Sequence, residues 1–189
     1  NVIFNWGDNN IYGGEKGKYN IVNNYYKPGP ASRHKNRLLN PSIPYGKFYV
    51  NGNFIEGSPD VSTNNWNGGV QCDNPSEAKS EKEFSANNVQ TQTPKDAYQE
   101  VIAHAGASFV RDAVDNRLIN YITNGYPTTK NGIIDSQNQV GGWPDLKSLP
   151  ALVDTDKDGM PDDWELKNNL KVGINDAAAY TLSKTYTNL

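Results

Sequence analysis

The hydrophobic residues of this chain fall in short blocks separated by turn residues, and three blocks near the N-terminus repeat one pattern. Residues 1–6 read NVIFNW, residues 24–27 read NYYK and residues 53–56 read NFIE, so the leading asparagine recurs at offsets of 23 and 29 residues. A repeat of about 20 to 50 residues built from short β-type runs predicts a solenoid. The recurring asparagine predicts a ladder of amide side chains that bond from coil to coil. Chance is the alternative, because asparagine is common in this chain.

After these blocks the pattern becomes irregular and then helical. Residues 58–92 are polar, which predicts a long loop outside the core. Thr93 can cap a helix that continues to Ala105, and Gly106 stops it. A second helix is predicted over residues 110–124, where Gly125 ends it. We expect both helices to pack across the flank or the end of the solenoid.

The amino-acid composition indicates a fold with many turns and limits the kinds of binding partner. The chain has 26 Asn, 17 Gly and 11 Pro among 189 residues, a mixture that favours turns. A net charge of -3 does not indicate a nucleic-acid partner or an anionic membrane surface, and no apolar run approaches the roughly 18 residues of a membrane span. The single cysteine, Cys72, excludes an internal disulfide framework. Because Asn1 begins the chain inside a strand pattern, we expect a fragment or processed product of a longer exported protein.

Residues 154–165, DTDKDGMPDDWE, have the pattern of a calcium-binding loop. Calcium takes about six to eight oxygen ligands, which an EF-hand loop supplies from fixed positions around a central glycine. The residues at the ligand positions are Asp154, Asp156, Asp158, Met160 through its carbonyl, Asp162 and Glu165, and Gly159 occupies the glycine position. A solvated acidic turn is the alternative, but so many carboxylates would repel one another without a cation. Magnesium fits less well because it keeps more of its waters.

The ligand set also indicates the role of the ion. All the predicted ligands are protein oxygens, and no general base or nucleophile lies beside the loop, so we expect a structural ion and not a catalytic one. A helix is predicted to follow, from about residue 162 to residue 170.

The remaining candidates for chemistry are weaker. Neither His34 nor His104 lies in a context that predicts a catalytic triad. Residues 33–37, RHKNR, form either a solvated loop or an anion-binding patch for a carboxylated sugar polymer, since arginine matches carboxylates. Four aromatic residues of the first blocks are candidates either for stacking on sugar rings or for the core: Trp6, Tyr12, Tyr25 and Tyr26.

Several longer motifs are similar to those of a known enzyme family. They are NVIFNWG (residues 1–7), YGGE (12–15), YNIVNNYYKPGP (19–30), VRDAVDNRLIN (110–120), IIDSQNQVGGWP (133–144) and the loop 154–165. Together they cover nearly the whole chain and resemble the C-terminal part of bacterial pectate lyases of polysaccharide lyase family 1. The resemblance implies a right-handed parallel β-helix. It also implies cleavage of polygalacturonate by β-elimination, in which an arginine removes the proton at C5 and calcium bridges the substrate carboxylate to acidic side chains.

The chain also departs from the family pattern. In the family, the aspartates that bind catalytic calcium and an Arg-x-Pro-x-x-Arg segment lie upstream of the NNVIFNW strand, and this sequence contains no Arg-x-Pro-x-x-Arg. No catalytic residue can therefore be assigned, and the chain alone is expected to be inactive. Lys16 and Lys18, which match the family loosely, and Arg33 are the candidates for substrate contact.

We therefore expect a mainly β fold in three parts. Residues 1–92 form the terminal coils of a right-handed parallel β-helix and a long loop, residues 93–150 form helices and loop packed on it, and residues 151–189 form a tail with an EF-hand-like calcium loop. The expected function is that of the C-terminal portion of an exported pectate lyase that is secreted, periplasmic or at the cell surface. It would act on polygalacturonate or pectin, with Ca²⁺ and the N-terminal part of the same protein. The alternative is a non-catalytic, calcium-stabilised carbohydrate-binding or surface module.

Overall fold

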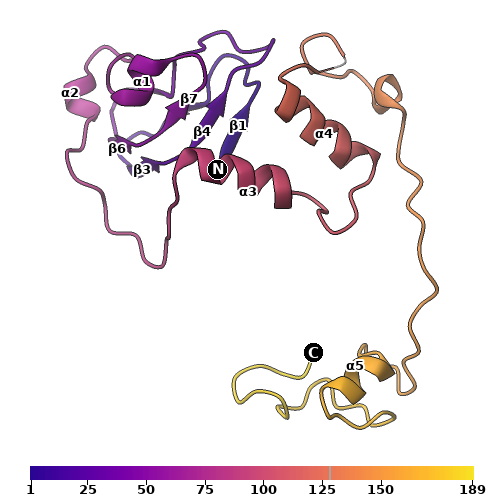
Figure 1. The fold of residues 1–189 in the computed structure, drawn as a ribbon. Coiled ribbons are helices and arrows are strands. Elements are labelled where there is room, and N and C mark those ends of the chain that lie inside the picture. The colour runs from indigo at the N-terminus through magenta and orange to yellow at the C-terminus, as the bar shows by residue number, and fades with distance from the viewer. Residues whose placement is uncertain (128) are drawn as a thin grey trace. The chain divides into compact units, whose positions relative to one another are not determined.

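The computed structural model describes residues 1–127 and 129–189 of the chain. These residues form two compact units, Asn1–Pro144 and Asp145–Leu189 (Figure 1). The strands of the first unit are β1 (Val2–Phe4), β2 (Ile11–Gly13), β3 (Lys18–Val22), β4 (Tyr25–Lys27), β5 (Leu39–Pro41), β6 (Lys47–Asn51) and β7 (Phe54–Ile55). Its helices are α1 (Pro59–Thr63), α2 (Pro75–Ala78), α3 (Pro94–His104), α4 (Ala113–Asn124) and the 3₁₀ helix η1 (Gln137–Val140), and the second unit contains α5 (Asp162–Lys167).

The strands of the first unit pair in parallel, each with the strand one repeat further along the chain. One sheet has the order β1-β4-β7, a second contains β2 and β5, and a third contains β3 and β6. Val2 pairs with Tyr25 and Tyr25 with Phe54, which reproduces the offsets of 23 and 29 residues predicted from the sequence. The repeat and the mainly β, parallel architecture are thus confirmed. The first two coils each contribute one short strand to each sheet, and the third contributes β7 to the first sheet.

A ladder of asparagine side chains joins successive coils, as the sequence predicts. The Asn1 amide donates to Asn24 Oδ1 at 2.8 Å, and the Asn24 amide donates to Asn53 Oδ1 at 2.8 Å. The Asn53 amide continues the ladder to Asn65 Oδ1 at 2.9 Å, a member that the repeat does not indicate. Asn24, Asn53 and Asn65 are all buried. Since buried amides are costly unless they are paired, the ladder fixes the register of the coils.

The core lies inside the coils, on one side of each pleated strand. In β6, Phe48 and Val50 are buried whereas Lys47 and Asn51 are exposed, which is the alternation of a half-buried strand. The ring of Phe48 stacks on Tyr19 with centroids 4.8 Å apart. The other fully buried apolar side chains of this core are Tyr26, Leu38, Leu39, Ile55 and Ala78. Each large side chain buried in this way contributes about 1.5–3 kcal/mol.

The prediction that residues 58–92 lie outside the core is wrong for the first part of this segment. Val61, Val70 and Ala78 are buried in the same cluster as the strands. Val70 forms a parallel bridge with Leu39, so the segment completes a further coil in which α1 and α2 take the place of long strands. Its polar residues face solvent around these few apolar contacts. Residues 80–92 have no helix or strand, as expected.

Helices α3 and α4 follow the predicted pattern with one change. The Thr93 hydroxyl caps α3 by accepting from the backbone of Asp96, and Gly125 ends α4 in the left-handed conformation with φ +74°. Asp112 caps α4, so this helix begins later than the predicted residue 110, and Val110 lies exposed outside it. The Asp112 carboxylate accepts from two backbone N–H groups that would otherwise be unpaired at the start of the helix. This cap fixes the helix start at Ala113, although the apolar periodicity begins earlier, at Val110.

Helix α3 contacts the β1–β4–β7 sheet, as predicted for a flanking helix. The ring of Tyr98 lies 4.5 Å from that of Tyr25 on β4. Lys27 Nζ, at the end of the same strand, donates to the Thr123 carbonyl of α4 at 3.1 Å. Helix α3 therefore covers one side of the coils, and Lys27 links α4 to the end of β4.

The second unit is small and comprises the predicted calcium loop, helix α5 and the C-terminal tail. Its buried side chains are Met160, Glu165, Leu170 and Asn188. Helix α5 ends at Lys167, before the predicted residue 170, because Asn169 adopts φ +60°. Among the described residues, no helix is both long enough and apolar enough to cross a membrane.

Candidate metal site

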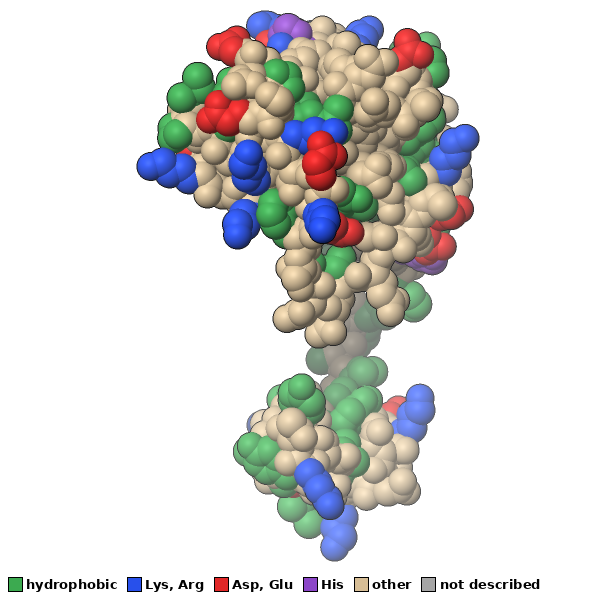
Figure 2. All heavy atoms as spheres, turned by 90° about the vertical axis from the view of Figure 1, so that its left-hand side faces the viewer, with side chains coloured by type: hydrophobic (Ala, Val, Ile, Leu, Met, Phe, Trp, Pro, Cys, Tyr) green, Lys and Arg blue, Asp and Glu red, His purple; other side chains and the backbone are tan. Residues whose placement is uncertain are grey.

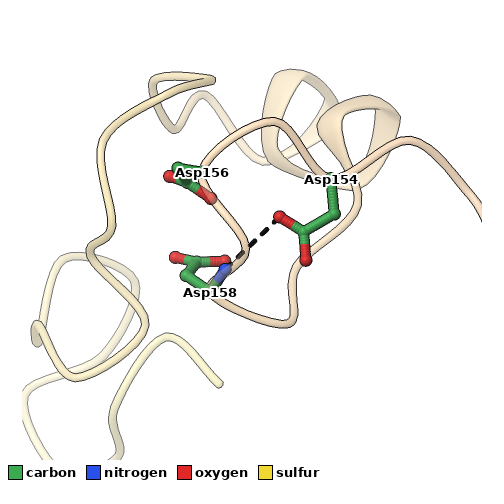
Figure 3. Close-up of side chains that lie close together, drawn as sticks. All are labelled: Asp154, Asp156 and Asp158. Atoms are coloured by element: carbon green, nitrogen blue, oxygen red, sulfur yellow. Dashed lines mark hydrogen bonds between the residues drawn. The ribbon is translucent and has the colours of Figure 1, made fainter.

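Three carboxylates of the second unit lie close together at the start of the predicted calcium loop. Asp154, Asp156 and Asp158 can each place one oxygen within 4.8 Å of the others (Figure 3). The Asp154 carboxylate accepts from the backbone N–H of Lys157 at 2.8 Å and of Gly159 at 3.0 Å. These bonds curl the backbone around the Asp154 side chain, which turns the three carboxylates toward one point.

Two carboxylates of the loop have no hydrogen-bond partner among the described residues. Both oxygens of Asp156 and both of Glu165 are inaccessible to solvent and unpaired. Glu165, on α5, is fully buried. Burial, together with the charges of Asp156 and Asp158, raises the pKa of Glu165, and burial followed by the charge of Asp158 raises that of Asp156. Isolated buried carboxylates are strongly unfavourable, and a hard cation is the partner that such a set of oxygens suits.

Asp162, the ligand predicted at the ninth position of the loop, is engaged differently. Its Oδ1 accepts from the backbone N–H of Thr155 at 2.8 Å and its Oδ2 accepts from the Thr155 hydroxyl at 2.7 Å. The structure brings Asp162 into neither of the carboxylate groups with metal-binding spacing. Its contacts join the two ends of the loop. Met160, whose backbone carbonyl is the predicted seventh-position ligand, is buried, with 1% of its surface accessible.

A second carboxylate group includes a residue that the sequence analysis did not identify. Asp158, Glu165 and Asp176 can each place one oxygen within 4.8 Å of the others. Asp176 lies beyond the loop, and its local sequence, GINDA, predicts a bend and not a ligand. Only the folding of the tail onto the loop brings it to this position.

The three residues predicted to contact substrate lie at two different corners of the coils. Lys16 lies in the turn between β2 and β3, and Lys18 begins β3, where it pairs in register with Lys47. Arg33 lies in the connection between β4 and β5, with its guanidinium 4.0 Å from the Asp8 carboxylate. Figure 2 shows basic side chains on the face of the first unit that carries α2, interspersed with acidic and neutral ones. The coils thus bring Lys16 and Lys18 together and leave Arg33 apart.

The aromatic candidates divide between the core and the surface. Trp6 and Tyr26 are buried and meet edge to face, with ring centroids 6.2 Å apart, so the interpretation of these two as sugar-stacking residues is wrong. Tyr25 packs against Phe54 and Tyr98. Tyr12 is the exposed member, with 72% of its surface accessible.

The histidines and the cysteine have ordinary surroundings. His34 Nε2 lies 3.4 Å from Asp8, and His104 Nε2 lies 3.5 Å from Glu100, both at the surface. Cys72 is free and partly buried, and burial raises the pKa of its thiol, which favours the unreactive protonated form.

Fold and site together define a protein of parallel β coils with a separate acidic loop that could hold a divalent cation. Proteins similar to this chain carry the name probable pectate lyase C. They include one from Aspergillus fumigatus, 29% identical over 199 residues, and one from Aspergillus flavus, 30% identical over 200 residues, each aligned with 100% of this chain. A third, from Aspergillus terreus, is 32% identical over 171 residues and covers 87% of this chain.

These relatives are longer than the chain. The alignments cover 46% of the A. fumigatus and A. flavus proteins and 40% of the A. terreus protein, so the chain spans less than half the length of each. No protein-family model matches the chain. The named relatives are fungal, whereas the motifs resemble bacterial enzymes, so bacterial origin stays a prediction. The relation to pectate lyases is supported by the named relatives.

Proposed function

We propose that this chain is the C-terminal portion of an exported pectate lyase that cleaves polygalacturonate by calcium-assisted β-elimination. The observation that carries the proposal is the alignment of the entire chain with proteins named probable pectate lyase C. The parallel coils and their asparagine ladder are consistent with the terminal turns of a right-handed parallel β-helix. Secretion, or retention in the periplasm or at the cell surface, fits an enzyme whose substrate is an external polymer.

In this proposal the catalytic arginine lies outside the chain. The chain has no Arg-x-Pro-x-x-Arg segment to supply it. Its own contribution is to complete the coils and to present basic side chains, Lys16, Lys18 and Arg33, to a carboxylated polymer.

The proposal is tested by comparing the 189-residue chain with a longer polypeptide that includes the upstream part of the same gene. Polygalacturonate and calcium are supplied, and the unsaturated product is followed by its ultraviolet absorbance. We expect turnover from the longer polypeptide and none from the chain alone. Robust turnover by the 189-residue chain would refute the assignment of the base to the upstream part, and a longer polypeptide inactive on all uronic-acid polymers would refute the lyase assignment.

A calcium ion bound by residues 154–165 is the second part of the proposal, and its role is structural. The unpaired buried oxygens of Glu165 and Asp156 support it. The direct ligands are Asp154, Asp156, Asp158, the Met160 carbonyl and Glu165, with Asp162 as the remaining residue of the sequence motif. The ion offsets the mutual repulsion of these carboxylates and holds the second unit folded.

Asp156→Ala is the sharpest test of this ion, because the Asp156 carboxylate accepts no hydrogen bond among the described residues. Asp163→Ala is the matched control, since Asp163 is exposed, is the second residue of α5 and belongs to neither carboxylate group. We expect Asp156→Ala to weaken calcium binding by at least roughly 10-fold in titration calorimetry, since even a residue that only orients a metal ligand contributes that much, and to expose the tail to protease. Equal affinities for the two variants would refute the calcium site.

An alternative is a non-catalytic carbohydrate-binding module stabilised by calcium. A groove of about 750 Å³ in the first unit favours it, because amide side chains line much of the groove and could bind sugar hydroxyls. The exposed Gln90 and Gln92 are the candidates, whereas Asn1, Asn20, Asn23 and Asn24 already bond within the protein. Titration of the chain with oligogalacturonides separates the two: tight binding by a chain whose longer form is never a lyase would favour the module.

A further inference from the structure

The orphaned oxygens of the second unit are not confined to the twelve-residue loop. Glu165 is fully buried, and both its oxygens lack a hydrogen-bond partner in residues 1–127 and 129–189. Oδ1 of Asp176 is likewise inaccessible to solvent and unpaired over the same ranges. One oxygen of each can lie within 4.8 Å of the other and of an oxygen of Asp158. Three anionic side chains at this separation repel one another unless a cation lies between them.

The EF-hand motif predicts Asp162 as a ligand of the ion, but in the structure the Asp162 side chain bonds to Thr155 instead. Both Asp162 oxygens accept hydrogen bonds from Thr155, one from its backbone N–H and one from its hydroxyl. Asp176, by contrast, keeps one oxygen free of protein donors and directed to the other carboxylates. Asp154 and Asp158 also accept hydrogen bonds, so distance decides between the other two aspartates: only Asp176 has an oxygen within 4.8 Å of other candidate ligands, and it therefore has the geometry of a ligand.

The tail is built to hold Asp176 in place. Asp158 Oδ2 accepts from the backbone N–H of Asp176 and from that of Ala177, both at 3.1 Å. The buried Asn188 side chain donates to the Asp176 carbonyl at 2.9 Å. The Leu189 N–H donates to the Ala177 carbonyl at 3.1 Å, which returns the end of the chain to the same point. Asp158 Oδ1 accepts one bond, from the Met160 N–H at 2.9 Å, so its second lone pair can still coordinate a cation.

We propose that Asp176 is a further ligand of the cation bound by the loop, and that the ion thereby fastens residues 176–189 to it. The assignment rests on the calcium site proposed above. With single oxygens from Asp154, Asp156, Asp158, Asp176 and the Met160 carbonyl, and two from Glu165, the ion has about seven oxygen ligands, within the six to eight that calcium takes. Asp162 then acts by closing the loop through Thr155.

The proposal extends the site beyond the motif. A twelve-residue loop binds calcium by itself, whereas a loop that needs Asp176 binds it tightly only when the tail is in place. Calcium binding and tail order are then one equilibrium, because the same ion that satisfies Glu165 also holds the bend at Asp176.

The experiment uses the 189-residue chain with Asp176→Ala, and with Asp163→Ala as the matched control. Calcium affinity is measured by titration calorimetry, and the number of waters on bound Eu³⁺ by luminescence lifetimes in H₂O and D₂O. We expect Asp176→Ala to weaken calcium binding by roughly 10- to 100-fold and to add about one water to the ion. Asp163→Ala should change neither quantity.

Two outcomes overturn the proposal, and a third variant separates its failure from that of the calcium site. If Asp176→Ala binds calcium with wild-type affinity and hydration while Asp156→Ala loses it, the loop site stands and Asp176 is not a ligand. If wild type and Asp156→Ala bind equally weakly, the calcium site fails and this assignment with it. Asp176→Asn, which keeps the shape of the side chain and one oxygen that can coordinate, guards against misfolding: an affinity between those of Asp176→Ala and wild type supports coordination by Asp176, and wild-type affinity of both Asp176 variants contradicts it.

Discussion

The buried amide of Asn53 is the point where the ladder can be tested most directly. Its Oδ1 accepts from the backbone N–H of Asn24 at 3.0 Å and from the Asn24 side chain at 2.8 Å. Asn53 is completely inaccessible to solvent and Asn24 is 8% exposed. Asn53→Ala removes the acceptor and leaves two N–H groups of Asn24 unpaired in an interior that water does not reach.

The size of the effect follows from these two groups. Each buried donor left without a partner costs about 1–3 kcal/mol, so the substitution should lower the free energy of unfolding of the first unit by about 2–6 kcal/mol. With a urea m-value of about 2 kcal/mol/M, a loss near 4 kcal/mol moves the unfolding midpoint down by about 2 M. The Asn53 amide also donates to Asn65, so the true figure lies toward the upper end.

Urea unfolding followed by far-ultraviolet circular dichroism measures this shift. Asn67→Ala is the control, because Asn67 is exposed in the same part of the chain and its side chain makes no described hydrogen bond. The control midpoint should stay within about 0.5 kcal/mol of wild type. If the Asn53→Ala midpoint moves no further than the control, the ladder contributes nothing to stability and the reasoning fails.

Three further predictions concern the helix cap, the loop glycine and pH. Asp112→Ala should lower the stability of the first unit by about 1 kcal/mol, because the carboxylate caps α4; an unchanged thermal unfolding midpoint would contradict it. Gly159→Ala should cost the second unit about 1–2 kcal/mol and weaken calcium binding in calorimetry, since Gly159 has φ +94° and an added Cβ would lie 3.0 Å from Leu189; wild-type affinity would count against this. Without calcium, the raised pKa values of Glu165 and Asp156 mean that the folded second unit binds protons more tightly than the unfolded chain. Without calcium, the stability of the second unit is therefore greatest below the ordinary pKa values of these carboxyl groups and is lost as the pH rises through their raised values. Saturating calcium needs ionised carboxylates, so with calcium the stability should instead rise with pH. Thermal unfolding with chelator and with calcium, each at about pH 4 and about pH 7, measures both dependences.

The parts of the fold that the sequence predicted correctly are those that depend on local repetition. The offsets of 23 and 29 residues appear in the strand register because parallel coils place equivalent residues side by side. Asn24 and Asn53 could be assigned to a ladder for the same reason. Thr93 and Gly125 were predictable because capping depends on the few residues around each helix end.

The features that were missed depend on contacts between distant segments. Val61 and Val70 are isolated apolar residues in a polar segment, and only the preceding coils provide the surface that buries them. Asp176 has no spacing relation to the calcium loop, because the tail reaches it through turns. Asp162 fits the loop motif, yet its oxygens face Thr155, a choice that the motif does not encode.

Strand β1 lies at the edge of its three-stranded sheet, and this has a practical consequence for the isolated chain. Its residues pair with β4 on one side only, and its leading amide, Asn1, donates inward to Asn24. An open parallel edge of this kind is a template for another strand. We therefore expect purified chain to self-associate as its concentration rises. The strands that add most readily should be those that bring an amide into line with Asn1, so the feature that sets the internal register would also select the strand that joins from outside.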